Sequence, residues 1–196
     1  NEDGSVRGVA TGNMGIGKDG EPTENFQLGM ELLGKYTIFA EGSRGHLRRQ
    51  LIARYKLDAH SDPQSYAIGI KELWEIDPSR HKPGLVMHTA GWPMDEQTYG
   101  GAFLYHAEDN KVYCGYVVGL SYKNPYLSPF EEFQRWKTHP RVKWYFTDDN
   151  GNVNAKRLSY GARAITAGGI LALPKTVFPG GALVGCDAGY LNVSRI

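Results

Sequence analysis

The apolar positions of the first sixty residues alternate with short polar turns, and they predict strands followed by a helix. Residues 6–11 and 35–40 are rich in β-branched and aromatic side chains and predict strands, the second of them buried. Residues 18–20, Lys-Asp-Gly, carry a hairpin turn signal, whereas residues 26–33 are compatible with either a strand or a helix. Residues 47–55 have apolar side chains at helical spacing, so we expect a glycine turn to join the second strand to a helix.

The middle of the chain has a period-two pattern. Residues 65–76 alternate apolar with polar side chains over their second half, and further aromatic and β-branched runs follow at short intervals. Such runs, separated by turns, predict an antiparallel sheet. A helix is expected to begin near Pro129 and to end before Pro140. The further expected strands are residues 85–92, 100–106, 112–120 and 157–163, with a turn at 108–111 and a loop at 148–152.

The last block of the sequence is again rich in glycine, with strand-and-turn patterns at residues 177–181 and 182–189. We therefore expect an α+β chain in which an antiparallel sheet with one helix is inserted into a glycine-rich α/β domain. The expected boundaries place residues 1–58 and 164–196 in the outer domain and residues 59–163 in the insert.

Composition limits the classes of function. The chain has 196 residues, 25 of them glycine, and a formal net charge of +1. A nucleic-acid surface needs concentrated Lys and Arg, so we expect no nucleic-acid partner. No apolar run approaches the roughly 20 residues of a membrane-spanning helix. The two cysteines, Cys114 and Cys186, supply neither a disulfide framework nor a four-thiolate metal site.

Both ends of the sequence suggest a piece of a longer protein. The first residue is Asn1 rather than Met, and residues 191–196 stop without a helix cap or a polar tail. We therefore expect the chain to be a fragment.

A strand followed by an acidic residue and glycine is the first candidate for chemistry. Glu41 and Gly42 follow the strand at residues 35–40, and Arg48 lies in the expected helix beyond them. Backbone N–H groups at a helix N-terminus attract phosphate, and glycine permits close approach because it has no Cβ. The segment is also compatible with a plain connection between a strand and a helix.

The same pattern occurs near the end of the chain. Asp187 lies between Gly185 and Gly189, after an expected strand. An acidic residue at this point can accept hydrogen bonds from a ribityl or ribose hydroxyl while the next turn approaches a phosphate. An ordinary turn explains the segment equally well.

Together the two segments resemble the flavin-binding fingerprints of flavoprotein hydroxylases and geranylgeranyl reductases. Residues 40–48, Ala-Glu-Gly-Ser-Arg-Gly-His-Leu-Arg, resemble the acid-glycine fingerprint, and residues 185–189, Gly-Cys-Asp-Ala-Gly, resemble the later glycine-x-aspartate motif. Further runs narrow the resemblance to the electron transfer flavoprotein–ubiquinone oxidoreductase family, and it extends over nearly the whole chain. These runs are residues 68–74, 91–93, 98–106, 124–130, 133–137 and 160–164.

The resemblance implies an oxidoreductase, an electron-transferring-flavoprotein dehydrogenase. Such an enzyme passes electrons from reduced electron transfer flavoprotein, through FAD and a [4Fe–4S] cluster, to ubiquinone in the membrane. The insert then corresponds to a ubiquinone-binding domain like the substrate domain of p-hydroxybenzoate hydroxylase. The resemblance also implies peripheral or monotopic attachment to the cytoplasmic face of a bacterial inner membrane or the matrix face of the mitochondrial inner membrane.

Two parts of that family's pattern are missing from this sequence. The opening G-x-G-x-x-G fingerprint is absent, since residues 12–17 read G-N-M-G-I-G. A [4Fe–4S] cluster needs four thiolates, and the chain has two cysteines. We therefore expect the parent protein to hold the cluster outside this fragment, and the isolated fragment to be inactive.

The resemblance assigns binding roles to eleven residues and an acid–base catalytic role to none. The quinone head group is expected at the main chain of two adjacent glycines, which weaken a strand unless a ligand approaches the backbone closely. A β-bulge is the alternative explanation for these glycines. The expected flavin contacts are Glu41, Gly42, Arg48, Gly185, Asp187, Ala188 and Gly189, and the expected quinone contacts are Tyr99, Gly100, Gly101 and Phe103.

Other side chains have less specific interpretations. Trp92 and Tyr105 are candidates to line the quinone slot, although aromatic residues of an antiparallel sheet more often belong to the core. The six histidines lack a zinc-ligand spacing, so we expect no metal site, and we expect His106 to be structural. Two other functions remain open: a different flavoenzyme of the same fold, such as a geranylgeranyl reductase or hydroxylase, and a non-catalytic, aromatic-rich β module that binds a ligand.

Overall fold

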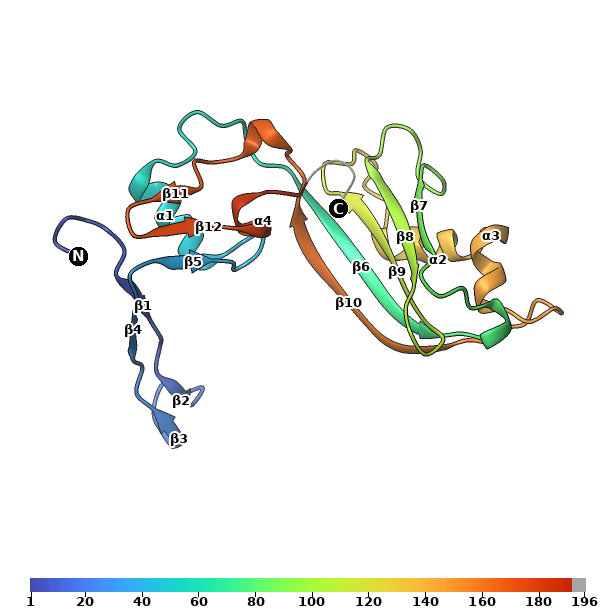
Figure 1. Cartoon of the computed structure of the whole chain (residues 1–196), viewed down its shortest axis with the longest axis horizontal. Coiled ribbons are helices and arrows are strands. Elements are labelled where there is room, and N and C mark those ends of the chain that lie inside the picture. Colours follow the sequence, from blue (N-terminus) through green and yellow to red (C-terminus); the bar gives the residue numbers. More distant parts are fainter. Residues whose placement is uncertain (192–196) are drawn as a thin grey trace. The chain divides into compact units, whose positions relative to one another are not determined.

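The chain forms two units in a computed structural model that describes residues 1–191 (Figure 1). Unit 1 comprises Asn1–Asp62 and Gly169–Tyr190, and unit 2 comprises Pro63–Gly168 together with Leu191. The chain thus leaves unit 1 after residue 62 and returns to it at residue 169, where the sequence placed these boundaries after residues 58 and 163. The last five residues, on which the expectation of a fragment partly rests, lie outside the described residues.

Unit 1 contains a small sheet and one three-turn helix. Its elements are β5 (Thr37–Phe39), α1 (His46–Tyr55), a 3-10 turn (Ile170–Ala172), β11 (Val177–Phe178), β12 (Gly181–Leu183) and α4 (Gly185–Ala188). Strand β12 pairs parallel with β5 and antiparallel with β11. The predicted order of strand, glycine turn and helix is confirmed. The core of this unit consists of Phe39, Leu51, Leu57, Phe178, Leu183 and Ala188.

The prediction that residues 35–40 form a buried strand is correct for Phe39 alone. Phe39 is buried, whereas the side chains of Ile38 and Tyr36 are 61% and 78% exposed. The reason is that β5 lies at the edge of the sheet, in the order β11-β12-β5, and packs with one face only.

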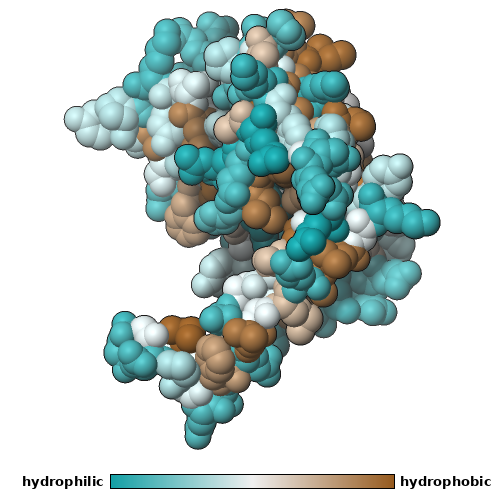
Figure 2. Space-filling view, turned by 90° about the vertical axis from the view of Figure 1, so that its left-hand side faces the viewer, coloured by the Kyte–Doolittle hydropathy of each residue, from teal (hydrophilic) through white to brown (hydrophobic). Residues whose placement is uncertain are grey.

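An antiparallel ribbon precedes β5 in unit 1. It consists of β1 (Gly8–Ala10) paired with β4 (Glu31–Leu33), and of β2 (Met14–Ile16) paired with β3 (Pro22–Gln27). The predicted turn at residues 18–20 is confirmed, and the ambiguous residues 26–33 include the end of β3 and the whole of β4. Figure 2 shows hydrophobic side chains gathered on this ribbon at the lower end of the view. The exposed apolar residues are Met14, Ile16, Phe26, Leu28, Met30, Leu32 and Leu33.

Unit 2 is built on a five-stranded antiparallel sheet, which confirms the prediction from the period-two pattern. The strands are β6 (Tyr66–Glu75), β7 (Val86–Ala90), β8 (Gly100–His106), β9 (Lys111–Gly119) and β10 (Lys156–Thr166). They lie in the order β10-β6-β9-β8-β7, so that β10, from the far end of the insert, pairs with β6. Strand β10 is longer than the sequence predicted.

Helices cover one face of this sheet. Helix α2 (Pro129–Lys137) begins after Ser128, whose side chain accepts a hydrogen bond from the backbone N–H of Glu131. Pro140 does not simply end α2, because it begins a second helix, α3 (Pro140–Lys143). Two 3-10 turns complete the unit, Pro78–Arg80 and Trp144–Phe146.

The core of unit 2 lies between α2 and the covered face of the sheet. Side chains alternate between the two faces of a strand, so the residues at every second position of β8 and β9 point toward α2. Phe133 and Trp136 of α2 are nearly fully buried against them. The sheet contributes Ala102, Leu104, Cys114, Tyr116 and Val118 to this core.

A buried ion pair ties β6 to α2. The Glu72 side chain is 2% exposed, and its carboxylate accepts hydrogen bonds from Lys137 Nζ at 2.6 Å and Trp74 Nε1 at 2.8 Å. A third donor, Arg157 of β10, lies at 3.3 Å. Three donors around one carboxylate offset the cost of removing its charge from water.

Substitution Glu72→Gln is expected to lower the free energy of unfolding of unit 2 by about 3 kcal/mol, because Lys137 then remains buried without a counter-charge. Urea unfolding followed by tryptophan fluorescence measures this, since all four tryptophans lie in unit 2. Asp109→Asn is the matched control, because it breaks an exposed ion pair with Lys111 and is expected to cost less than about 1 kcal/mol. Equal losses in the two variants would contradict this account of the buried pair.

His106 is a buried imidazole at the end of β8. It is 4% exposed, its Nδ1 accepts a hydrogen bond from the backbone N–H of Lys82 at 3.1 Å, and its ring lies 5.1 Å from that of His81. Burial lowers the pKa of His106 to about 4, and the nearby charges of His81 and Lys82 act in the same direction. The interpretation of His106 as structural agrees with this environment.

The stability of unit 2 is expected to fall as the pH drops from about 6.5 to 4. In this window the unfolded chain binds a proton at residue 106 that the folded chain excludes, a difference on the order of 2–3 kcal/mol. His106→Asn, which keeps an acceptor for the Lys82 N–H, is expected to remove that part of the pH dependence. His60→Asn, outside unit 2, should leave it intact in the same fluorescence measurement. An unchanged slope in His106→Asn would refute the assignment.

Candidate functional site

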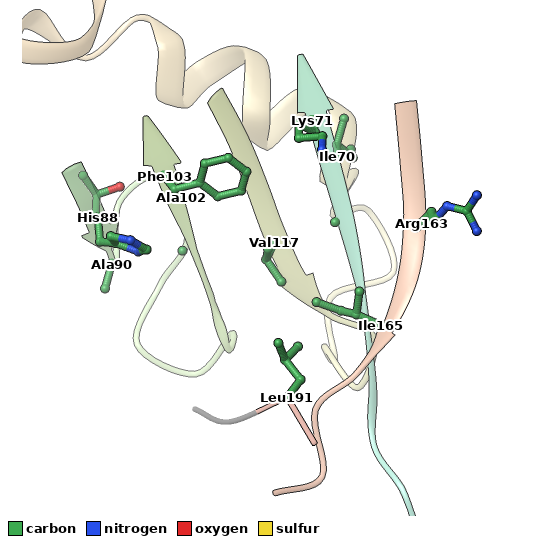
Figure 3. A pocket seen from close by; sticks show the side chains of 13 residues that line it. Ile70, Lys71, His88, Ala90, Ala102, Phe103, Val117, Arg163, Ile165 and Leu191 are labelled. Atoms are coloured by element: carbon green, nitrogen blue, oxygen red, sulfur yellow. The ribbon is translucent and has the colours of Figure 1, made fainter. Parts of the chain in front are cut away.

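The face of the unit 2 sheet opposite α2 is hollowed into a cavity of about 480 Å³ (Figure 3). Cross-strand pairs place small side chains beside one another on this face: Ala90 opposite Gly101, and Gly69 opposite Val117. Larger groups stand around them, with His88 on β7 at one side and Ile165 and Arg163 on β10 at the other. The cavity is lined by residues 69–71, 88–90, 101–103, Val117, Arg163, Ile165 and Leu191.

Glycine keeps the floor of the cavity open. A Cβ on Gly69 would lie 3.8 Å from its nearest neighbours, Val117 Cγ2 and Arg163 O, so a side chain here would fit the sheet and project into the cavity. Gly115 has a different reason, because a Cβ there would lie 2.3 Å from the ring of Phe103. The Phe103 ring thus lies flat over Gly115 and forms one wall.

The four residues predicted to contact quinone divide between the two faces of the sheet. Gly101 and Phe103 line the cavity. Gly100 points to the covered face, where a Cβ would collide with Met94 and with the carbonyl oxygen of Val117. Tyr99 is not among the lining residues, and its carbonyl accepts a hydrogen bond from Gly119 N at 2.7 Å. The alternation of a strand therefore separates two glycines that the sequence pattern had grouped together.

The β-bulge that the sequence left open as an explanation for these glycines is absent from this part of β8. Gly100 pairs with Val118 and Gly101 with Val117, and the register then continues without a shift to His106.

Several lining residues were missed by the sequence interpretation. Lys71, His88 and Arg163 lie on three different strands and share the cavity only because of the register of the sheet. The available signal was alternation within each strand, but alternation alone does not say which strands are neighbours. Tyr105, proposed as a lining residue, stands just outside the cavity and packs on Phe103 with ring centroids 4.8 Å apart.

Trp92 belongs to a second, smaller cavity at the outer edge of β7. This space has a volume of about 360 Å³ and shares residues 88–90 of β7 with the first cavity. Its other walls include Trp92, His139 and Arg141. Trp92, a candidate to line the quinone slot, therefore lines this smaller cavity and not the larger one.

In unit 1, the carboxylate of Glu41 occupies the first turn of α1. Its oxygens accept hydrogen bonds from the backbone N–H groups of Leu47 at 3.3 Å and Arg48 at 3.0 Å. The sequence interpretation left these donors free for a phosphate. A negatively charged side chain at a helix N-terminus is favourable for the same electrostatic reason as a phosphate, and here the chain supplies its own anion.

A second carboxylate lies close to that of Glu41. Asp187 is fully buried, and neither of its side-chain oxygens has a hydrogen-bond partner among the described residues. Burial raises the pKa of Asp187 to about 6, and the charge of Glu41 adds to the shift. Gly45 lies between them, where a Cβ would come within 2.7 Å of both carboxylates. Buried Arg48 donates from Nε to the backbone carbonyl of Asp187.

The glycines of the two acid-glycine segments are required by backbone conformation. Gly42, Gly185 and Gly189 have φ values of +87°, +59° and +92°, which side chains with a Cβ rarely adopt. No atom lies within 4 Å of a Cβ position at Gly42 or Gly185, so space remains beside the backbone at both turns. Ala188, in contrast, is fully buried in the core. A buried carboxylate without a hydrogen-bond partner thus lies near two open glycine turns, whereas Glu41 occupies the N–H groups at the start of α1.

Neither cysteine belongs to a metal-binding group of the described chain. Among residues 1–191 no three His, Cys, Asp or Glu side chains are grouped as metal ligands. Cys114 is buried in unit 2, where burial raises the pKa of its thiol to about 12, and Cys186 lies in unit 1. Within the same residues, no helix has the length and apolar character needed to cross a bilayer.

Solved structures with a similar fold are flavoproteins. A triple mutant of the flavin-dependent brominase Bmp2 aligns with a TM-score of 0.52 at 13% identity, covering 84% of this chain and 39% of its own. A flavoprotein/dehydrogenase from Cytophaga hutchinsonii aligns with a TM-score of 0.53 at 12% identity, covering 88% and 39%. At such identities the likeness concerns the fold alone. The chain therefore has a fold found in flavin-dependent enzymes.

The family follows from sequence comparison. Residues 66–165, which span the sheet of unit 2 and its cavity, match the family model described as "ETF-QO, ubiquinone-binding". The chain belongs to this family, electron transfer flavoprotein–ubiquinone oxidoreductase, and the resemblance read from the sequence is confirmed.

Named relatives match the chain over its whole length. The "probable electron transfer flavoprotein-ubiquinone oxidoreductase" of Acinetobacter baylyi is 60% identical over 99% of this chain, and the Pseudomonas aeruginosa enzyme is 57% identical over 100%. The mitochondrial enzyme of Sus scrofa is 54% identical over 100%. The chain spans 33%, 34% and 31% of the length of these three relatives, about a third of each.

Unit 1 is expected to lose stability as the pH rises from about 4 to 7. Because the folded pKa of Asp187 is about 6, folding favours the protonated carboxyl, and ionisation at higher pH costs on the order of 2–3 kcal/mol. Asp187→Asn is expected to remove this loss and to stabilise unit 1 at pH 7. Hydrogen exchange of the α1 peptide, residues 46–55, at pH 5 and pH 7 reports the change.

The matched control for that measurement is Asp58→Asn, an exposed acidic residue of the same unit. It should leave the protection of α1 unchanged at both pH values. Equal protection of the wild-type helix at pH 5 and pH 7, after correction for intrinsic exchange, would contradict the raised pKa.

Proposed function

We propose that the parent of this chain is an electron-transferring-flavoprotein dehydrogenase, and that this chain supplies its ubiquinone pocket and part of its flavin domain. In the parent, electrons pass from reduced electron transfer flavoprotein, through FAD and a [4Fe–4S] cluster, to ubiquinone. The observation that carries the proposal is the cavity of unit 2, which lies within residues 66–165, the segment matched by the ubiquinone-binding family model.

The cavity suits a quinone head group by size and by chemistry. Val117 and Ile165 give it apolar walls, and the Phe103 ring offers a flat surface for a planar ligand. Gly101 lines the cavity, where a quinone oxygen can approach its backbone without meeting a Cβ. In this proposal Gly101 and Phe103 contact the quinone, while Gly100 acts by packing against Met94, and Tyr99 helps to hold the end of β8.

For the flavin domain, we assign different tasks to the predicted residues. The buried and unpartnered carboxylate of Asp187 is the group suited to accept hydrogen bonds from ribityl hydroxyls. Gly42 and Gly185 leave space beside the backbone, Gly189 ends α4 in the left-handed conformation, and Glu41 and Arg48 hold α1 and α4 together around Asp187. When bound, FAD would accept electron pairs and pass them on singly.

The remaining partners belong to the parent protein. A [4Fe–4S] cluster needs four thiolates, which we place outside this chain because its two cysteines lie in different units. Electron transfer flavoprotein is the proposed donor, and the membrane is the proposed source of ubiquinone. We propose peripheral attachment of the parent to the cytoplasmic face of a bacterial inner membrane, or to the matrix face of the mitochondrial one.

An absorbance spectrum of the full-length parent, recorded before and after dithionite, tests the cofactor part of the proposal. Flavin bands together with a broad iron–sulfur shoulder are expected, and both should bleach. Flavin bands without that shoulder would favour another flavoenzyme of the same fold. A spectrum with neither would favour a binding module without redox activity and would overturn the proposal.

Substitution Gly69→Val in the parent tests the quinone site. The new side chain fits the sheet but fills part of the cavity, so the KM for a soluble ubiquinone analogue is expected to rise about tenfold, equivalent to ~1.4 kcal/mol. Gly161→Val is the matched control, since a Cβ at Gly161 meets no atom within 4 Å and the residue lies on the same face but outside the cavity lining. An equal KM for both variants would argue against quinone in this cavity.

A further inference from the structure

A histidine and a tyrosine form a hydrogen-bonded pair at the rim of the cavity. His88 of β7 lines the cavity, and its Nε2 lies 3.0 Å from the hydroxyl oxygen of Tyr105 on β8. The rings are 5.5 Å apart, and Tyr105 also packs against Phe103. No described residue makes a hydrogen bond to the other ring nitrogen of His88, Nδ1. One nitrogen is therefore engaged by Tyr105 and the other is available to a ligand.

His88 borders both the cavity and solvent. It is exposed, Tyr105 beside it is half-buried, and β7 is the edge strand of the sheet. The backbone of residues 88–90 separates the main cavity from the smaller one on the outer side of β7. A proton can thus reach His88 directly from water and leave it on the cavity side, while Tyr105 holds the ring.

The lysine and arginine side chains near His88 are poorly matched to proton transfer near neutral pH, and the imidazole of His139 lines only the smaller cavity. Lys71 and Arg163 line the same cavity, and His139 and Arg141 line the smaller cavity behind β7. No carboxylate lines either cavity within the described residues. An ammonium or guanidinium group ordinarily keeps its proton far above pH 7, whereas an imidazole ordinarily exchanges one close to neutrality.

We propose that His88, held in place by Tyr105, relays a proton from solvent to the quinone, an inference that rests on the proposed function. Reduction of a quinone to a quinol takes up two electrons and two protons. The electrons come from the reduced flavin of electron transfer flavoprotein by way of the parent's cofactors. At the oxygen facing β7, the Nδ1–H bond of the His88 imidazolium breaks as the quinol O–H bond forms, and a neutral imidazole with its proton on Nε2 remains.

The relay is then reset from solvent. The neutral His88 takes up a new proton at Nδ1 from water, which restores the imidazolium, while Nε2–H donates a hydrogen bond to the Tyr105 hydroxyl oxygen and keeps the ring in place. The second proton of the quinol comes from water at the other carbonyl oxygen. The net step is therefore quinone plus two electrons plus two protons to quinol, with His88 as a catalytic residue and Tyr105 as the positioning residue that holds its ring.

The test uses the reduced full-length parent and two acceptors in stopped-flow reoxidation. Ubiquinone-1 takes up electrons and protons, whereas ferricyanide takes up electrons alone. For His88→Gln we expect reoxidation by ubiquinone-1 to slow about 100-fold and to lose its pH dependence near neutrality, with the ferricyanide rate unchanged. Tyr105→Phe should slow the quinone step about tenfold, and His60→Gln, far from the cavity in sequence and in the other unit, should match wild type.

Chemical rescue separates proton delivery from a structural role. The quinone rate of His88→Ala is expected to recover at least tenfold with added imidazole, which a packing defect would not do. The relay is overturned if His88→Gln reduces ubiquinone-1 at the wild-type rate, if both acceptors slow equally, or if imidazole has no effect. A wild-type parent that ubiquinone-1 fails to reoxidise would instead overturn the proposed function, and the relay with it.

Discussion

Antiparallel hydrogen bonding in the five-stranded sheet is the constraint on which unit 2 depends. It forces successive side chains to opposite faces, so one face can pack against α2 while the other remains hollow. The same rule sends Gly100 into the core beside Met94 and Gly101 into the cavity, one residue apart. A slip of one residue in β8 would exchange their positions, closing the hollow and opening the core. The register of β8 therefore determines both which of its residues pack in the core and which line the cavity.

Unit 1 depends on a different constraint, the crowding of two carboxylates around a glycine. Glu41 satisfies the first turn of α1, and this places a negative charge beside buried Asp187. Arg48 then joins α1 to α4 through the carbonyl of Asp187, while Gly45 leaves the space that both acidic side chains need. Glu41 of the first acid-glycine segment thus has a structural role at the start of α1. Asp187 is the carboxylate without a hydrogen-bond partner among the described residues, which is why the ligand contact is proposed for Asp187.

The sequence predicted most of the strands because their periodicity is local. Residues 100–106 became β8 with no change of bounds, and the helix from Pro129 to Lys137 followed from the two prolines, Pro129 at its start and Pro140 beyond its end. The cavity could be predicted only in part, since Gly101 and Phe103 belong to one strand whereas His88 belongs to another. Strand order and register are long-range properties, and no pattern within a single segment encodes them. The exposure of Ile38 could not be predicted either. An edge strand and a central strand can have the same local composition, so the sequence of residues 35–40 does not show that β5 lies at the edge of its sheet.

The way in which the insert begins and ends has a consequence for how the chain folds. Tyr66 at the start of β6 pairs with Thr166 at the end of β10, and Gly168 donates a hydrogen bond to Gln64. Folding of unit 2 therefore brings its two ends together. In unit 1, the parallel pair of β5 and β12 joins Thr37 to Gly181, segments separated by the whole insert. Closing so long a loop in an unfolded chain carries a large entropic cost. A folded insert lowers this cost, because it reduces the open loop to residues 40–65 on one side and residues 167–180 on the other. The folded insert thus brings the two segments of the outer sheet closer together. We therefore expect unit 2 to fold before β5 pairs with β12, because the first and last strands of the insert pair with each other.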